Sequence, residues 1–501
     1  MSKQIRNLGV FLVLCYAALF VQVNRLTVLE AEELQDKPEN LRSVVRDFSS
    51  PRGDIVTADD VVIATSTPSG NEYRFQREYP RGDLFGHITG FFAFELGDAG
   101  VEAEYNGYLT GDDIGFSLDR LGDLFVDRDV VGDVILSMRD DVQQVARDGL
   151  GGNEGSVVAL DPRNGEIIAM WSNPSFDPNA LATHDFDEAE AAAEALNADP
   201  ERPTRGRAFR ERFFPGSTFK IVTATAGIER GGVTPEEPEY PVTTSYQPPR
   251  GGRPIPNFGG SSCGGRLFDV LQQSCNTSFA QMGVDTGGTN LQETAQGFGF
   301  DREVPFDVPG GVASSFPEAV VNDPPLLAQA AIGQNEVQAT PLQMAMVAAA
   351  VANDGQVMEP HVMREIRDDQ GDKVREYDAE VWTTAMSTET AGTLREAMES
   401  VVTDGTADRL DDGLDGFVVG GKTGTAQLGT DPPSSHAWII GFAGPPGETP
   451  HVAVAVIVQG QPGVSEQTGG RVAAPIAAAV MQQALAPPQE AEQDGDQGAG
   501  G

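Results

Sequence analysis

The stretch FFPGSTFKIVTATAGIE (213–229) carries the pattern that decides how this 501-residue chain folds. A Gly-Ser turn opens an apolar run rich in Ala and Thr, which predicts that Ser217 lies at the start of a helix. The free N–H groups there favour a developing negative charge. Lys220 follows Ser217 by almost one helical turn, so both side chains share a face and the amine can reach the hydroxyl. The apolar residues before Ser217 predict a lowered pKa for Lys220, toward that of a general base.

A second pattern is Ser274-Cys275-Asn276, after the helical run LFDVLQQ (267–273). Its hydroxyl can relay a proton, and its amide can hydrogen-bond a peptide carbonyl or N–H. Ser and Asn also cap helices and turns, so this pattern alone carries little weight.

The third pattern is Lys422-Thr423-Gly424-Thr425, at the end of a strand-like run. Gly424 lets a substrate backbone lie close against an edge strand. The charge of Lys422 and the hydroxyls of Thr423 and Thr425 can hold a carboxylate. A surface β-turn is the ordinary alternative for this pattern alone. In this order, however, the three patterns form the set found in serine acyl-transferases that penicillin inhibits.

Over nearly its whole length the chain resembles the class B penicillin-binding proteins. Two stretches resemble the non-catalytic N-terminal module of that family: RGDIVTADDVVIATS (52–66) and GVEAEYNGYLTG (100–111). Four others resemble its transpeptidase domain: SVVALDPRNGEIIAMWSNPSFDPN (156–179), IGQNEVQATPLQMAMVAAAVANDG (332–355), VVTDGTA (401–407) and AWIIGFAG (437–444). Cys275 in the middle motif resembles the actinobacterial branch, with its shape and division enzymes. One departure is Ala58-Asp59-Asp60, where the family has Arg-Asn-Gly, and it concerns a structural turn.

The fold class that follows is α+β. The resemblance implies a serine β-lactamase/transpeptidase-like domain at 151–486, in which an antiparallel sheet carries helices on both faces and an all-helical subdomain is attached. A β-rich, dimerisation-type module is expected at 27–150, and a disordered acidic tail at 487–501.

Local patterns support this fold class. Pro-Arg-Asn-Gly predicts a hairpin at 156–171, and 340–355 reads as a helix. An exposed helix or insertion is expected at 185–198. Three strand-like runs are 417–427, 436–444 and 451–460.

The resemblance implies a role for each motif residue. Ser217 would attack the penultimate D-alanine of a stem peptide ending in D-Ala-D-Ala and form an acyl-enzyme. Lys220 would take the Ser217 proton, and Ser274 would pass it to the leaving amine. Asn276 would orient the substrate amide.

Lys422, Thr423 and Thr425 would hold the substrate carboxylate, with Gly424 giving room. The backbone N–H groups of Ser217 and Thr425 would form the oxyanion hole. An amine from a neighbouring stem peptide would then complete a cross-link, in cell elongation or in division. β-Lactam antibiotics are expected to acylate the same serine, and neither a metal nor an organic cofactor is expected.

Other activities fit the residues less well. A D,D-carboxypeptidase is the nearest rival, because water can replace the acceptor amine. A class A β-lactamase needs Glu-x-x-Leu-Asn, which is absent between Asn276 and Lys422. A penicillin-sensing receptor needs more spans or a signalling domain, and a bifunctional enzyme needs a glycosyltransferase domain before Ser217. A Ser-His-Asp hydrolase needs a G-x-S-x-G elbow, and none of the five histidines accompanies one.

The N-terminus predicts a membrane anchor. Residues 8–21 carry no charge, and Lys3 and Arg6 precede them. An uncleaved span at 8–26 is expected, with residues 1–7 in the cytoplasm and the catalytic domain outside. A cleaved signal peptide has the same order of charge and apolarity but lacks its A-x-A site here. The resemblance also implies a polytopic membrane glycosyltransferase as partner.

Two further expectations come from composition. Cys263 and Cys275 lie in the exported part, where oxidation favours a disulfide, and neither a C-x-x-C pair nor a histidine cluster supports a metal site. With 34 Lys and Arg against 75 Asp and Glu, the net charge is -41. Such a surface repels nucleic acid and anionic lipid headgroups, so neither is expected as a ligand. Adaptation to salt and simple solubility explain the acidity equally well.

Overall fold

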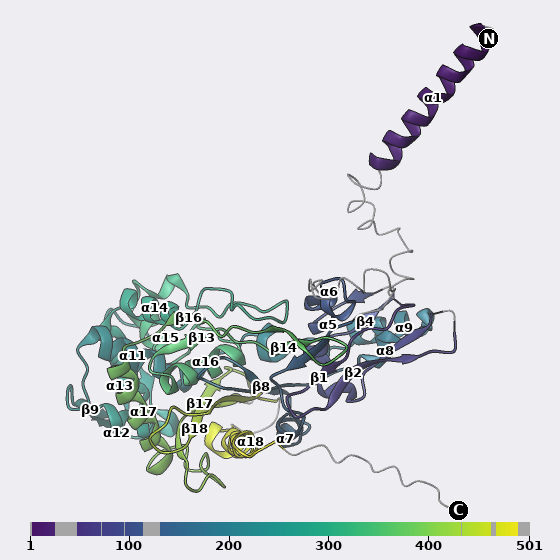
Figure 1. Cartoon of the computed structure of the whole chain (residues 1–501). Coiled ribbons are helices and arrows are strands. Elements are labelled where there is room, and N and C mark those ends of the chain that lie inside the picture. The colour runs from purple at the N-terminus through teal and green to yellow at the C-terminus, as the bar shows by residue number, and fades with distance from the viewer. Residues whose placement is uncertain are drawn as a thin grey trace, which may run out of the picture.

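The computed structural model describes residues 3–25, 48–71, 73–94, 96–113, 131–431, 433–461 and 467–488 (Figure 1). The predicted N-terminal module at 27–150 and tail at 487–501 therefore lie partly outside the described residues. Helix α1 (Lys3–Asn24) covers most of the predicted span. Its segment Lys3–Gln22 has a mean hydropathy of 1.7 and is long and apolar enough to cross a membrane.

A five-stranded antiparallel sheet forms the centre of the C-terminal part, in the order β17-β18-β19-β7-β8. The predicted hairpin is β7 (Gly155–Leu160) and β8 (Ile167–Asn173). The three predicted C-terminal strands are β17 (Val418–Gln427), β18 (Ser435–Gly444) and β19 (Val452–Val458). The side chains of β18 and β19 are buried along the whole of both strands, so helices must cover both faces.

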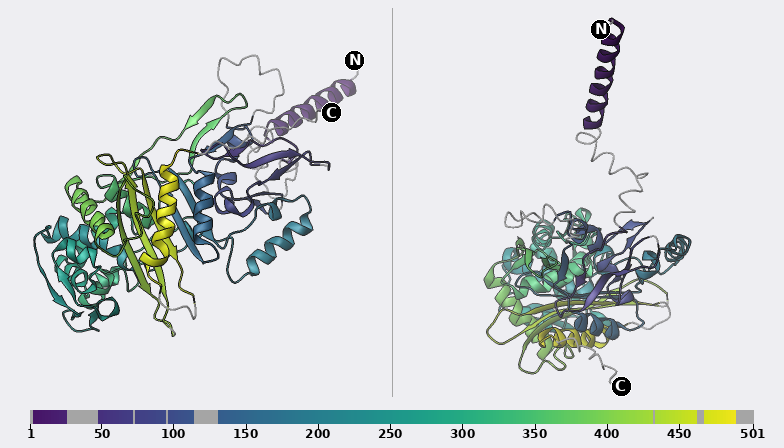
Figure 2. Two further views of the ribbon diagram at one scale, coloured as in Figure 1. Left: turned by 90° about the horizontal axis from the view of Figure 1, so that it is seen from below. Right: turned by 45° about the vertical axis from the view of Figure 1, so that its right-hand side comes forward.

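Those helices come from three places in the sequence. Helix α16 (Pro341–Ala352) is entirely buried and packs on β7, β18 and β19. The Thr340 hydroxyl caps it by accepting from Gln343 N, and Pro341 occupies its first turn. Helices α7 (Asp140–Leu150) and α18 (Ala474–Leu485) lie side by side on the same sheet (Figure 2).

An all-helical subdomain lies at the β17 side of this sheet, at the left of Figure 1. Apolar side chains bury its helices against one another. Its main members are α11 (Lys220–Gly231), α12 (Leu267–Gln272), α13 (Asn276–Thr286), α14 (Gly288–Gly297), α15 (Pro324–Ala330) and α17 (Thr388–Thr403). The predicted fold class, an α+β transpeptidase-like domain with this subdomain, is therefore confirmed.

The N-terminal module contains a six-stranded sheet in the order β15-β14-β6-β1-β2-β3. Its strands are β1 (Ile55–Val56), β2 (Val62–Pro68), β3 (Phe75–Glu78), β6 (Asp133–Leu136), β14 (Met363–Arg367) and β15 (Lys373–Glu376). Strands β14 and β15 lie inside the range predicted for the transpeptidase domain, yet they complete the sheet of the module. The two parts of the chain therefore share a sheet.

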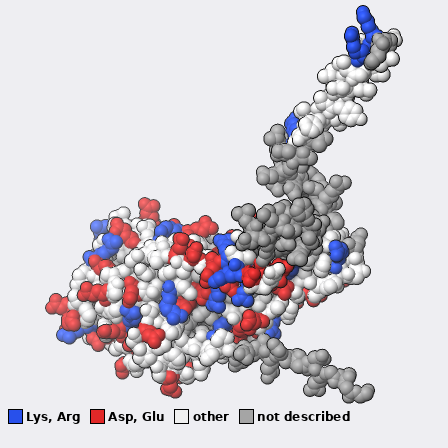
Figure 3. Space-filling view, viewed as in Figure 1, with Lys and Arg blue, Asp and Glu red and all other residues white. Residues whose placement is uncertain are grey.

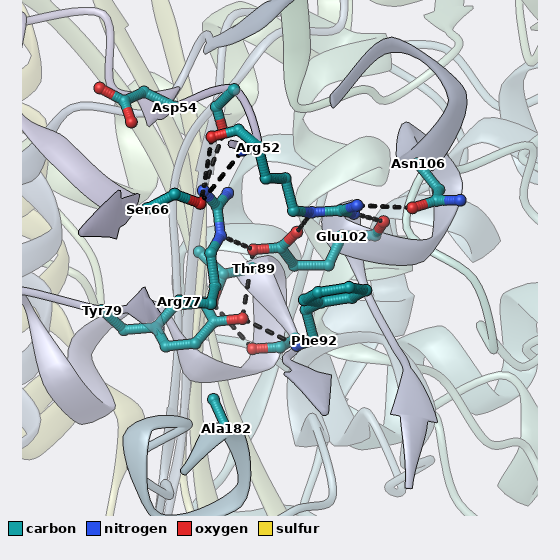
Figure 4. A network of polar contacts seen from close by, with 12 residues as sticks. Arg52, Asp54, Ser66, Arg77, Tyr79, Thr89, Phe92, Glu102, Asn106 and Ala182 are labelled. Atoms are coloured by element: carbon teal, nitrogen blue, oxygen red, sulfur yellow. Dashed lines mark hydrogen bonds and ion pairs between the residues drawn. The ribbon is translucent and has the colours of Figure 1, made fainter. Parts of the chain in front are cut away.

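A buried ionic network holds the module together (Figure 4). Glu102 has no exposed surface and pairs with Arg52 and Arg77, each Nε lying 2.6 Å from one of its carboxylate oxygens. Arg52 also donates to Asn106 Oδ1 at 2.6 Å, and Tyr79 Oη donates to Glu102 at 3.1 Å. Burial opposes ionisation of Glu102, but the two guanidinium groups hold the pKa of its carboxyl below the usual value.

The turn in which the sequence departs from the family has a second task. Asp60 takes a positive φ of 60°, and Asp59 is buried. The Asp59 carboxylate accepts from the backbone N–H groups of Asp140 at 2.9 Å and Asp141 at 3.2 Å. These are the first residues of α7, whose own N-cap side chain makes no capping bond. Asp59 therefore caps a helix that lies on the central sheet.

Candidate active site

Ser217 lies in a short 3-10 turn (Gly216–Phe219) that runs directly into α11 at Lys220, as the sequence predicts. Gly216 has a φ of 54°, and a Cβ on it would lie 3.1 Å from the backbone of Thr425 and Ala426 on β17. Gly216 N also donates to Gly333 O at 3.0 Å. Only glycine fits this close approach, so the turn presents Ser217 directly beside β17.

The Lys220 side chain is fully buried at the start of α11. Its ammonium donates to the Ser274 carbonyl at 2.7 Å, to Ser274 Oγ at 3.2 Å and to Asn276 Oδ1 at 2.8 Å. Within the described part of the chain no hydrogen bond joins Lys220 to Ser217, so that contact stays a prediction. Burial, and then the charge of Lys422, lower the pKa of Lys220 well below its ordinary value.

Lys422 approaches the same hydroxyl from β17. Its ammonium donates to Ser274 Oγ at 2.8 Å and to Thr423 O at 2.9 Å. The side chain is fully buried, and burial lowers the pKa of Lys422 to about 7. Ser274 Oγ thus lies between two amines that both lose their protons readily. A proton can pass through this hydroxyl from one side of the site to the other.

The middle motif forms the link between two helices. Ser274 takes a positive φ of 57° after α12, and Asn276 begins α13. While Asn276 Oδ1 accepts from Lys220, its Nδ2 donates to Pro256 O at 3.0 Å. The structure joins Cys275 to Cys263 in a disulfide, with the two Cα atoms 5.6 Å apart. The hydrogen bonds of Asn276 and the disulfide of Cys275 therefore both hold the motif in place.

The third motif lies on β17, which is an edge strand of the five-stranded sheet. A Cβ on Gly424 would lie 2.9 Å from Trp438 Cβ and 3.0 Å from both Pro215 O and Thr218 Cγ2. Glycine is therefore needed here because the Ser217 turn packs against the strand. The hydroxyls of Thr423 and Thr406 are hydrogen-bonded at 2.7 Å.

The three motifs meet in a cleft of about 910 Å³. Ser217, Ser274 and Asn276 line it together with Thr423, Gly424 and Thr425 on β17, whereas Lys220 and Lys422 lie buried behind this lining. The sequence predictions therefore identify residues from three distant segments that the fold brings to one place.

Four lining segments were missed: 253–261, 329–334, 406–409 and 468–471. Gly469-Gly470 was the available signal for the last one, because adjacent glycines mark a close backbone approach. A Cβ on Gly469 would lie 2.9 Å from Gly424 O. Among the described residues no cluster of three or more His, Cys, Asp or Glu side chains is placed to hold a metal ion.

Comparison with known families and proteins agrees with this geometry. Residues 155–482 match the penicillin binding protein transpeptidase domain, and residues 52–135 match the penicillin binding protein A dimerisation domain. The peptidoglycan D,D-transpeptidase PbpA of Mycolicibacterium smegmatis is 35% identical over 499 residues, which cover 97% of this chain and 99% of that protein. The protein of the same name from Mycobacterium tuberculosis is 32% identical over 97% of this chain and 99% of its own length.

Solved structures give the same picture. A ceftriaxone acyl-enzyme complex of penicillin-binding protein A from M. tuberculosis superposes with a TM-score of 0.79 at 32% identity, covering 88% of this chain and all of that one. PBP2 of Pseudomonas aeruginosa superposes with a TM-score of 0.71 at 28% identity, over 87% of this chain and 95% of that one.

Proposed function

This chain belongs to the penicillin-binding protein transpeptidase family, and we propose that it cross-links peptidoglycan stem peptides through an acyl-enzyme on Ser217. The observation that carries the mechanism is the single hydroxyl of Ser274, hydrogen-bonded by both Lys220 and Lys422 beside Ser217. Two buried amines with lowered pKa values and one bridging hydroxyl supply the proton transfers that acyl transfer needs. The enzyme is a D,D-transpeptidase that β-lactams inhibit.

In the acylation step, Ser217 Oγ forms a bond to the carbonyl carbon of the penultimate D-alanine. The Ser217 proton moves to neutral Lys220, and the developing oxyanion is held by the backbone N–H groups of Ser217 and Thr425. The C–N bond to the terminal D-alanine then breaks. Its nitrogen takes a proton through Ser274, so the leaving group departs as an amine.

In the second step, the amine of another stem peptide attacks the ester carbonyl. Lys220 accepts the proton of that amine, the C–O bond to Ser217 breaks and Ser217 regains a proton. Asn276 would hold the peptide amide during both steps, since its amide lies at the cleft wall beside Lys220. Thr423 and Thr425, with Gly424 between them, would hold the terminal carboxylate, with Lys422 behind them.

The cellular setting is part of the same proposal. Helix α1 is consistent with a single-pass membrane protein. We place its basic N-terminus in the cytoplasm and the catalytic domain outside, where peptidoglycan is built. A polytopic membrane glycosyltransferase would polymerise the glycan strands whose peptides this enzyme joins.

Product analysis distinguishes cross-linking from trimming. The detergent-solubilised full-length enzyme is incubated with a stem peptide ending in D-Ala-D-Ala and a second peptide carrying a free amine. A transpeptidase forms the amide-linked dimer in proportion to acceptor concentration while it releases D-alanine. Release of D-alanine without dimer at every acceptor concentration would instead show a carboxypeptidase. Ser217→Ala serves as control and forms neither product.

A further inference from the structure

The charged side chains that line the active-site cleft are mostly basic, whereas the chain as a whole is strongly acidic. The chain has 75 acidic and 34 basic residues, and acidic side chains are spread over the visible face in Figure 3. Among the described residues that line the cleft, however, the charged side chains are Arg253, Arg409, Arg471 and Asp408. A substrate peptide that ends in a carboxylate is repelled by the acidic surface. The arginines therefore offer the attraction that the rest of the surface lacks.

Lys422 does not provide an exposed positive charge for the substrate carboxylate. Its ammonium is used by Ser274 Oγ and Thr423 O, its side chain is fully buried, and it loses its proton near neutral pH. The Thr423 hydroxyl is hydrogen-bonded to that of Thr406. Strand β17 thus offers hydroxyls to a carboxylate but no exposed, permanently charged group. An arginine supplies that charge at any physiological pH.

Arg471 lies beside the part of β17 that carries the third motif. It follows Gly469-Gly470, whose backbone packs against Gly424 O and the Thr406 backbone so closely that neither glycine has room for a Cβ. A Cβ on Gly470 would also lie 3.6 Å from Thr423 Cγ2. The segment that carries Arg471 therefore packs directly against Thr406 and Thr423, the two residues whose hydroxyls are hydrogen-bonded.

The two charged residues near Arg471 in the cleft lining, Asp408 and Arg409, leave its guanidinium free to bind a ligand. Arg409 Nη1 donates to the backbone carbonyl of Arg471 at 3.4 Å, while its Nε lies 3.5 Å from Asp412. Asp408, which also lines the cleft, would repel an anion, whereas the adjacent Arg409 would attract one. In the described part of the chain no ion pair engages the Arg471 guanidinium.

We propose that Arg471 binds the C-terminal carboxylate of the peptide that acylates Ser217 and thereby makes the enzyme require a free carboxylate. This inference rests on the proposed transpeptidase function. It adds a specificity-determining residue outside the three motifs, held in place by the close packing of the two glycines before it.

A matched pair of substrates tests the assignment. One is an N-acylated D-alanyl thioester of thioglycolate, which ends in a carboxylate, and the other ends in the corresponding primary amide. Thiol release gives kcat/KM for wild type, Arg471→Gln, Arg471→Lys and Arg253→Gln. We expect Arg471→Gln to lower kcat/KM for the acid about tenfold, because one charge-assisted hydrogen bond is lost. Its kcat/KM for the amide stays unchanged.

Two control variants test whether the effect depends on the positive charge and on its position in the cleft. Arg471→Lys retains a positive charge and recovers part of the preference for the acid. Arg253→Gln removes an equal charge from another segment of the cleft lining, residues 253–261, and keeps the preference intact. An equal fall for both substrates in Arg471→Gln, or no fall, contradicts the carboxylate role, and thermal melting shows whether the variant is folded. A wild-type enzyme that forms no acyl-enzyme with either thioester contradicts the transpeptidase function itself.

Discussion

At the scale of single residues, the arrangement around Ser274 explains how a serine without a histidine partner becomes reactive. Lys220 is buried away from water and repelled by the charge of a second lysine, Lys422, and among the described residues its hydrogen-bond acceptors are all neutral. Each of these conditions disfavours its charged form. A lysine whose pKa is lowered in this way accepts the Ser217 proton more readily near neutral pH, as the proposed acylation requires.

The pH dependence of acylation follows from these pKa shifts. Since only neutral Lys220 accepts a proton, the acylation rate constant rises with pH through the lowered pKa and is level above it, far below the ordinary lysine value. In Lys422→Gln the repelling charge is gone, so the pKa of Lys220 rises. We expect the rising limb to move to higher pH by about one unit.

Stopped-flow measurement of acylation by a fluorescent penicillin gives the rising limb of the pH profile for the wild type and for Lys422→Gln. A limb that stays in place, or moves to lower pH, in Lys422→Gln contradicts the proposed repulsion between the two amines. Lys373→Gln is the control, because Lys373 lies on β15, outside the cleft, and pairs with Glu376.

Much of this residue-scale picture could be predicted from sequence. Ser217 lies in the 3-10 turn that runs directly into α11 at Lys220, so their three-residue spacing predicts that the two side chains share a face. The hydrogen bonds of Lys220 and Lys422 to one hydroxyl could not be predicted, because they join segments more than 50 residues apart through α12 and β17. No sequence motif marks Arg409 or Arg471 as a residue of the cleft.

At the scale of elements, the transpeptidase sheet was predictable and the module's sheet was less so. Strands β7, β18 and β19 are continuous apolar runs bounded by turn residues, and α16 carries both a capping Thr and a Pro at its start. Strand β15 is exposed along its whole length, and β14, although partly buried, carries charged residues at three of its five positions. Strand β6, the partner of β14 in this sheet, lies far earlier in the chain, so no local pattern signals their pairing.

The buried network of the module gives an element-scale prediction. Glu102→Gln leaves two buried guanidinium groups without their shared carboxylate. We expect the free energy of unfolding to fall by about 3–5 kcal/mol. Urea unfolding followed by circular dichroism measures this loss.

Glu104→Gln is the matched control, since Glu104 is exposed on the same short helix, α5 (Val101–Glu104). It should change the stability by about 0.5 kcal/mol or less. Equal losses in the two variants would show that the Glu102 network does not hold the module together.

At the scale of the whole molecule, the module and the transpeptidase domain are joined at several points. Besides the shared sheet, Tyr105 Oη donates to Asp307 at 2.8 Å, and Asp307 also accepts from the backbone N–H groups of Val362 and Met363. Burial raises the pKa of Asp307 to about 6. Asp59 adds the helix cap on α7. We therefore expect the two parts to unfold together rather than as independent units.

Asp59 offers a direct test of that coupling. In Asp59→Ala, helix α7 loses the acceptor for its first N–H groups, and we expect a loss of about 1–2 kcal/mol. Because α7 packs on the central sheet, the loss should appear in one cooperative transition. Two separate transitions in the wild-type protein by calorimetry would contradict the coupling. Asp60→Asn is the control, since Asn tolerates the same positive φ.

The central claim is that Ser217 carries the acyl group. Intact-mass measurement of the full-length enzyme after incubation with benzylpenicillin, followed by peptide mapping, tests it most directly. We predict one added penicilloyl group, located on the peptide that contains Ser217, and none in Ser217→Ala. A penicilloyl group that persists in Ser217→Ala, or that maps to another residue in the wild type, would contradict the account.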